Sequence, residues 1–269
     1  MINIKSITRT LLGVTAVVAA LGVSQQATAG ISTTKHNLGS TSTVGNNQTA
    51  NTAEICVFCH TPHASNTSVS APLWNKGVSP GAYTTYSTAN STTLDGEVLT
   101  VGSISLACLS CHDGAQAMDN LVNAPGSGGY NAGGALAGYT WTGANQTAGK
   151  ITGVANLGKD LTNDHPIGIR YCGGGQIQGT PTGSCVDPDF VAPSNATINS
   201  EVVFWVDTGG GGRQKTDMIL YNRSFATAPA GVGPSVECGS CHDPHNSTNA
   251  TFLRIANTGS AVCLACHVK

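Results

Sequence analysis

The pattern of hydrophobic and polar positions along the chain predicts little regular secondary structure. Only two short runs, residues 201–206 and 218–221, have the β-branched and aromatic composition of strands, and glycines 209–212 lie between them. Two such runs joined by a glycine-rich turn predict a β-hairpin over residues 201–221. Most of the remaining chain alternates short apolar stretches with Gly, Ser, Thr and Asn, which favours loops.

One longer apolar run stands near the start of the chain. Residues 11–23 follow the basic residues Lys5 and Arg9 and precede the sequence Ala27-Thr28-Ala29. This order is typical of a secretory signal peptide, and the run is short for a membrane span. We therefore expect residues 1–29 to be removed on export. The mature chain would be a soluble protein of residues 30–269, without a transmembrane span.

Composition argues against a conventional hydrophobic core. Aromatic residues make up only 5% of the chain and charged residues 10%, whereas glycine occurs 34 times. A chain so poor in large apolar side chains needs another source of buried surface. Charge also limits the function, because without Lys5 and Arg9 ten basic side chains face fourteen acidic ones. Nucleic-acid binding, which requires a basic surface, is not expected.

The chemistry of the chain is concentrated in four copies of the pattern C-x-x-C-H. Each pattern is an attachment site for a c-type haem, in which two thiols bind the porphyrin edge and the histidine becomes an axial ligand of the iron. A zinc ribbon would not require the histidine after each second cysteine. The predicted haem-binding cysteines are Cys56 and Cys59, Cys108 and Cys111, Cys238 and Cys241, and Cys263 and Cys266. The predicted proximal ligands are His60, His112, His242 and His267.

The remaining cysteines and histidines complete this interpretation. Cys172 and Cys185 bracket a glycine-rich loop, and in an exported chain they predict a disulfide. Four further histidines match four irons that each need a sixth ligand: His36, His63, His165 and His245. We expect four bis-histidine haems c. His63 and His245 follow their own proximal histidines too closely to reach the opposite haem face, so each should serve a neighbouring haem.

Six-coordinate iron has no open position for a substrate, so the ligand count predicts an electron carrier and not an enzyme. The expected fold is a coil-rich multihaem cytochrome with few short helices and one β-hairpin around a haem core. Within it, residues 30–53 would form a flexible N-terminal arm that carries His36, and residues 236–269 a terminal block with two haems.

The segments KHNLG, EICVFCHTPH, APLW, ACLSCHDG, NDHPIGI and VECGSCHDPHN, followed by AVCLACH, carry a family resemblance. The chain resembles exported multihaem c-type cytochromes with doubled C-x-x-C-H motifs. Among these, it is most similar to small tetrahaem extracellular cytochromes of metal-reducing bacteria that polymerise into conductive filaments. In such filaments one axial histidine comes from the adjacent subunit, and the resemblance makes His36 the candidate donor. The long glycine-rich centre and the Cys172–Cys185 loop have no counterpart in the family pattern.

Three functions remain open from the sequence. The first is a secreted homopolymer that delivers electrons at the cell surface to acceptors such as metal oxides. The second is a soluble periplasmic shuttle between other redox proteins. The third is a haem reductase, which would need one iron with an open coordination position.

Overall fold

The computed structural model describes residues 30–268, except residues 46, 80, 90, 127 and 128. The signal peptide expected at residues 1–29 lies outside the described residues. Among the residues that are described, no helix is long and apolar enough to cross a membrane. The expected fold class is confirmed, because short helices and small sheets are joined by long irregular segments.

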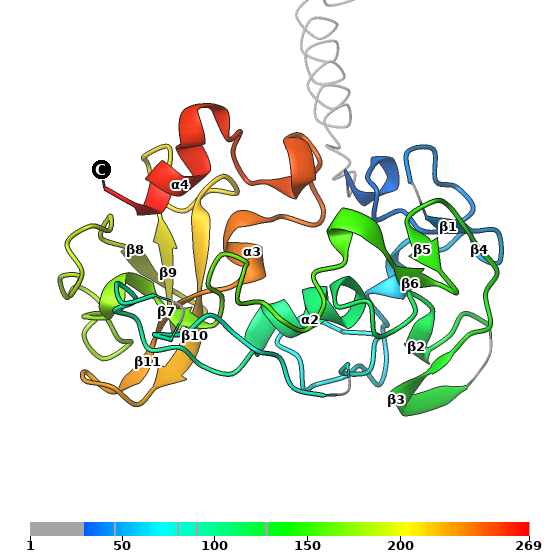
Figure 1. The fold of residues 1–269 in the computed structure, drawn as a ribbon, viewed down its shortest axis with the longest axis horizontal. Coiled ribbons are helices and arrows are strands. Elements are labelled where there is room, and N and C mark those ends of the chain that lie inside the picture. The colour runs from blue at the N-terminus through cyan, green and yellow to red at the C-terminus, as the bar shows by residue number, and fades with distance from the viewer. Residues whose placement is uncertain (1–29, 46, 80, 90, 127–128, 269) are drawn as a thin grey trace, which may run out of the picture.

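Figure 1 shows a larger sheet at one end of the molecule, α2 and α3 in the middle, and small two-stranded sheets at the other end. The α-helices are α2 (Ser103–His112), α3 (Cys238–Cys241) and α4 (Ala261–Cys266). Short 3-10 helices are η1 (Gly30–Thr33), η2 (Cys56–Phe58), η3 (Gly153–Ala155), η4 (Tyr171–Gly173), η5 (Ala250–Phe252) and η6 (Thr258–Ser260).

The larger sheet has five antiparallel strands in the order β7-β11-β10-β9-β8. Its strands are β7 (Ile169–Arg170), β8 (Ser194–Ile198), β9 (Glu201–Val206), β10 (Met218–Phe225) and β11 (Gly231–Val236). Strands β9 and β10 confirm the predicted hairpin, with Leu220 opposite Phe204. The sheet is larger than predicted, because β8 joins β9 through a two-residue turn at Asn199 and Ser200, whose positive φ angles suit a tight hairpin.

Three two-stranded sheets make up the other end of the molecule. They pair β1 (Gln48–Thr49) with β4 (Trp141–Thr142), β2 (Asn120–Asn123) with β3 (Tyr130–Leu136), and β5 (Gln146–Thr147) with β6 (Lys150–Ile151). Strand β1 lies in the segment 30–53, which was expected to be a flexible arm. The segment contacts distant parts of the chain, because β1 pairs with β4 and the Asn47 side-chain amide donates to the Asn145 carbonyl at 2.9 Å.

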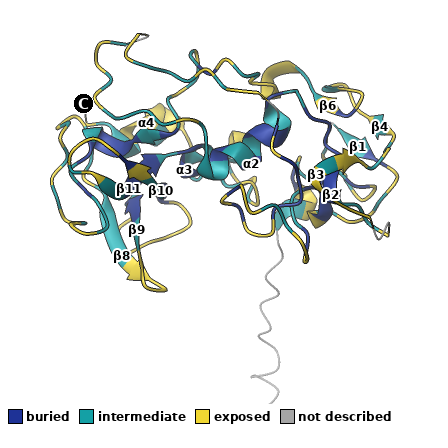
Figure 2. Ribbon diagram, turned by 90° about the horizontal axis from the view of Figure 1, so that it is seen from below, coloured by how far each residue is buried: buried dark blue, intermediate teal, exposed yellow. Residues whose placement is uncertain are grey.

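The apolar core is divided into small clusters. In the largest, Phe204 and Val206 of β9 and Met218 and Leu220 of β10 lie on one face of the sheet, as the two-residue period of a strand requires. The partly buried Cys241 and Cys266 pack against this cluster. Buried residues run from the sheet through α3 into α2 (Figure 2). The sheet therefore supports the two C-terminal C-x-x-C-H motifs directly. The predicted disulfide between Cys172 and Cys185 is present beside the same cluster.

Buried Asn75 connects the first C-x-x-C-H motif to β2. Its side-chain amide donates to the carbonyls of Val57 at 2.6 Å and Asn123 at 2.9 Å, and its oxygen accepts from the Asn123 N–H at 2.8 Å. The side chain is completely buried. Removal of the amide would abolish all three of these hydrogen bonds.

We expect Asn75→Ala to lower the free energy of unfolding by about 2–4 kcal/mol, because it removes three hydrogen bonds and leaves a cavity at a completely buried side chain. Thermal unfolding of the haem-loaded protein would show this as a lower Tm. Asn163→Ala, at an exposed position, is the matched control and should leave Tm unchanged. Equal Tm values for the two variants would contradict the role given to Asn75.

Candidate haem-binding site

Each C-x-x-C-H motif forms one helical turn that places its two cysteines on the same side. The motifs lie in η2, at the end of α2, in α3 and at the end of α4. In the first, third and fourth motifs the histidine N–H donates to the carbonyl of the first cysteine, at 2.7, 3.2 and 2.9 Å. Because residues i and i+3 of a helical turn lie on one face, both thiols can reach one porphyrin edge.

The two residues between the cysteines of a motif can anchor its helical turn by packing into the protein interior. In the first three motifs these residues are buried: Val57 and Phe58, Leu109 and Ser110, and Gly239 and Ser240. The fourth motif differs, since Leu264 is 49% exposed. Buried side chains thus anchor three of the haem-attachment turns, whereas the fourth turn lies at the surface.

In the described part of the chain, several histidines direct Nδ1 at a backbone carbonyl oxygen. The distances are 2.6 Å from His60 to Pro72, 2.8 Å from His112 to Ala155, 2.7 Å from His242 to Thr251, 3.2 Å from His36 to Pro244 and 3.0 Å from His165 to Pro166. A proton on Nδ1 satisfies the carbonyl and leaves the Nε2 lone pair for a metal, which is the usual arrangement of a ligating histidine. In the same way, Nδ1 of His245 lies 3.7 Å from a carboxylate oxygen of Asp243.

Two pairs of histidine rings have the separation that a shared iron requires. The ring centroids of His60 and His245 are 6.2 Å apart, and so are those of His36 and His112. Two metal–imidazole bonds of about 2.0 Å, with each nitrogen about 1.1 Å from its ring centre, give about 6.2 Å across a metal ion. The residues therefore fit two bis-histidine irons, one at the first motif and one at the second.

The environment of His36 also fits a ligand. Its ring stacks on Phe252 with a centroid distance of 4.4 Å, which fixes its orientation. Burial, followed by the neighbouring His112, lowers the pKa of His36 to about 4. The ring is therefore neutral at pH 7, as a metal ligand must be. Burial likewise lowers the pKa of His112.

The four motifs are neighbours in the order of the sequence. Burial, and after it the nearby Cys111, raises the pKa of the Cys59 thiol to about 12. The neighbouring Cys238, followed by burial, raises the pKa of the Cys108 thiol, and Cys108 lowers the pKa of Cys238. Burial, and after it Cys241, raises the pKa of Cys266 to about 12. The first motif therefore adjoins the second, the second the third, and the third the fourth.

The other two predicted distal ligands do not form such ring pairs. His63 and His165 are both exposed. The segment after His165 reaches the third motif, because the Gly168 N–H donates to the Val236 carbonyl at 2.8 Å, two residues before Cys238. His63 lies beside β2, where its carbonyl accepts from the Asn123 amide at 2.8 Å. The ring of the proximal His267 contacts Phe190 at 4.4 Å.

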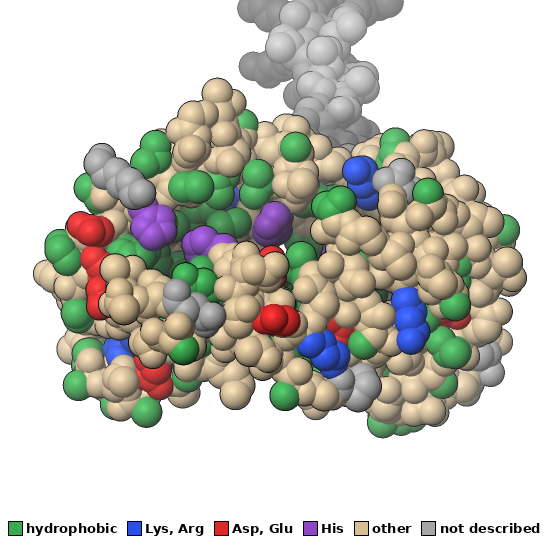
Figure 3. All heavy atoms as spheres, viewed as in Figure 1, with side chains coloured by type: hydrophobic (Ala, Val, Ile, Leu, Met, Phe, Trp, Pro, Cys, Tyr) green, Lys and Arg blue, Asp and Glu red, His purple; other side chains and the backbone are tan. Residues whose placement is uncertain are grey.

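The surface between the motifs suits an apolar, planar group. Figure 3 shows histidine side chains gathered in a hollow of one face, and hydrophobic side chains line its floor. The cysteines of all four motifs are free thiols in the described chain. Porphyrin faces bound in this hollow would supply the buried apolar surface that the composition lacks.

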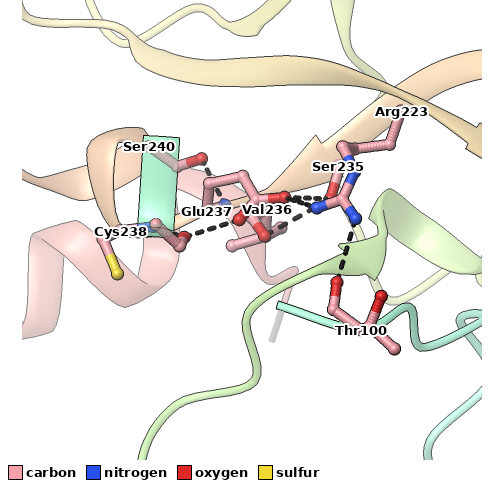
Figure 4. Close-up of polar contacts among 8 residues, drawn as sticks. Thr100, Arg223, Ser235, Val236, Glu237, Cys238 and Ser240 are labelled. Atoms are coloured by element: carbon pink, nitrogen blue, oxygen red, sulfur yellow. Dashed lines mark hydrogen bonds and ion pairs between the residues drawn. The ribbon is translucent and has the colours of Figure 1, made fainter. Parts of the chain in front are cut away.

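Sequence reasoning did not find a polar network next to the third motif. Buried Glu237 accepts hydrogen bonds from Ser105 at 2.5 Å, Arg223 at 2.7 Å and Ser235 at 3.1 Å (Figure 4). Glu237 is also the N-cap of α3, in a reciprocal capping arrangement with Ser240. The pattern E-x-x-S is a reversed capping box, and it could have indicated from the sequence that a helix begins at Cys238. Burial raises the pKa of Glu237.

Comparison with known proteins agrees with these observations. Residues 228–269 match the family model described as the doubled CXXCH motif. No curated protein matches the chain. The motifs and this match support a c-type cytochrome with doubled haem-binding motifs. Multihaem cytochromes of this type bind haem c covalently and work in electron transfer, and such proteins are typically exported.

Loss of either paired distal histidine should change one haem. We expect His36→Gly and His245→Gly each to convert one of the low-spin haems to a high-spin form, because one iron loses its sixth ligand. Absorption and electron paramagnetic resonance spectra would show the change, and added imidazole should restore the low-spin spectrum. Lys35→Gly is the control and should have the wild-type spectrum. A fully low-spin His245→Gly protein would disprove the His60–His245 pairing.

Proposed function

We propose that this protein conducts electrons through four bis-histidine haems c and catalyses no reaction of its own. The observation that carries the proposal is the pairing of histidine rings at 6.2 Å in two places. Bound haem would supply a redox-active iron, and the paired histidines would hold that iron from both sides. A substrate would then have no iron position to bind, which disfavours a reductase.

The order of the motifs supports conduction along the molecule. Contacts between successive motifs form a continuous series, from the first motif near β2 to the fourth at α4. In Figures 1 and 2, β2 and α4 lie at opposite ends of the molecule. An electron that enters at one end could therefore leave at the other.

Support for a polymer comes from the ligand count. His36 was the expected donor to an adjacent subunit, but its ring lies beside His112 of its own chain, which favours an intramolecular role. If His165 serves the haem of the nearby third motif, the remaining donor is His63 and the remaining acceptor is the haem of His267. These two histidines belong to opposite ends of the molecule.

A head-to-tail polymer would bring them together. In such a heterologous contact, His63 of one copy binds the iron held by His267 of the next, and the haem series continues across the boundary. Two exposed apolar residues, Leu264 and Val268, flank His267 with exposures of 49% and 53%. Such residues suit a surface that is covered by a second copy. We propose an extracellular filament that receives electrons from other redox proteins and passes them to acceptors such as metal oxides.

Electron microscopy of the exported, haem-loaded protein tests the polymer. We expect filaments for the wild-type protein and for His36→Ala, and only dispersed particles for His63→Ala. The His63→Ala protein should also contain one high-spin haem, because one iron loses its ligand. Dispersed particles for the wild-type protein would contradict the polymer and indicate a soluble shuttle. Filaments that persist in His63→Ala and vanish in His36→Ala would restore His36 as the bridging ligand.

A further inference from the structure

The polar network around Glu237 connects two haem-attachment turns that are far apart in the sequence. Glu237 precedes Cys238 at the start of α3, and Ser105 lies in α2, one turn before Cys108. The Ser105 hydroxyl donates to Glu237 Oε2 at 2.5 Å and accepts from the Cys238 N–H at 3.0 Å. One hydroxyl therefore bonds both the side chain that caps α3 and the first amide of α3.

The carboxylate of Glu237 is anchored on its other side. Its Oε1 accepts from Arg223 of β10 at 2.7 Å and from Ser235 of β11 at 3.1 Å. Arg223 also donates to the Thr100 carbonyl at 2.9 Å, just before α2 (Figure 4). The Glu237 side chain is fully buried and that of Arg223 is 16% exposed. A buried carboxylate is costly unless every oxygen has a donor, and here both oxygens do.

Helix α3 packs closely against its neighbours at Gly239. A Cβ atom at Gly239 would lie 3.2 Å from Ile104 of α2 and even closer to the Tyr221 hydroxyl of β10. The glycine thus allows α3 to approach both neighbours. At the same contact, the buried thiols of Cys108 and Cys238 lie next to each other. The polar network and the two sulfurs lie on either side of one junction between α2 and α3.

We propose that Glu237 and Ser105 are positioning residues, which lock the second and third haem-attachment turns together and so fix the relative placement of the haems bound there. A buried hydrogen-bonded network specifies one geometry more sharply than apolar contacts do. Electron exchange and optical coupling between two haems both depend on that geometry. The inference rests on haem attachment at these two motifs and does not depend on polymerisation.

Two serine variants separate positioning from general stability. Ser105→Ala and Ser235→Ala each remove one hydroxyl from the same carboxylate, but only Ser105 belongs to α2. Both proteins should carry four covalent haems by mass spectrometry, which confirms that they are comparable. We expect Ser105→Ala to change the amplitude of the circular dichroism signal of coupled haems in the Soret band and to shift the potentiometric titration curve. Ser235→Ala should leave both unchanged.

Hydrogen exchange adds a local measurement that does not depend on the haem spectra. In Ser105→Ala the amide of Cys238 loses its acceptor, so its exchange should become roughly five- to tenfold faster, while α4 exchanges as before. Glu237→Gln should show the same spectral changes as Ser105→Ala, because it weakens the same link. The proposal is overturned if Ser105→Ala and Ser235→Ala have the same Soret signal and titration curve, whether or not Cys238 exchanges faster.

Discussion

The structure depends on a single repeated constraint: two thiols and one imidazole must be held in fixed positions along one edge of a planar group. A single helical turn meets it, because the cysteines at i and i+3 lie on one side and the two residues between them point inward. In three motifs that inner pair is buried. The surrounding chain then needs little regular structure of its own, since its task is to bury these pairs and to bring the turns together.

Buried polar contacts hold together parts of this protein that a large hydrophobic core would hold together in other proteins. The buried hydrophobic clusters are small. Between them, Asn75 joins the first motif to β2, and Glu237 joins the third motif to α2 and the sheet. Fully paired buried polar groups are specific in direction, whereas apolar contacts tolerate sliding. For a protein that must hold several haems at fixed separations, directional contacts are the more useful kind.

Local sequence patterns carried most of what could be predicted. The C-x-x-C-H motifs, the β9–β10 hairpin and the disulfide loop each depend on residues that are close together in the chain. The pairing of β11 with β10 and β7 could not be read in this way, because residues 231–236 include Gly and Pro and have no strand pattern. The turn residues Asn199 and Ser200 could have indicated β8. The Ser-, Asn- and Thr-rich composition around them instead favoured a loop. The contacts of segment 30–53 could not be read from the sequence, because they are polar and join it to residues as distant as Asn145.

The histidine pairs of the functional site likewise depend on residues far apart in the sequence, so local patterns could not predict them. Sequence counting matches four distal histidines to four irons, but it cannot assign them, since His36 and His112 are 76 positions apart and His60 and His245 are 185 apart. Their pairing is a consequence of the fold. The C-terminal block brings Pro244 and Phe252 against His36 and places His245 opposite His60. The last segment of the chain would therefore complete the proposed coordination of the first two motifs. The geometry of the two N-terminal motifs therefore depends on contacts with a segment that lies far along the chain.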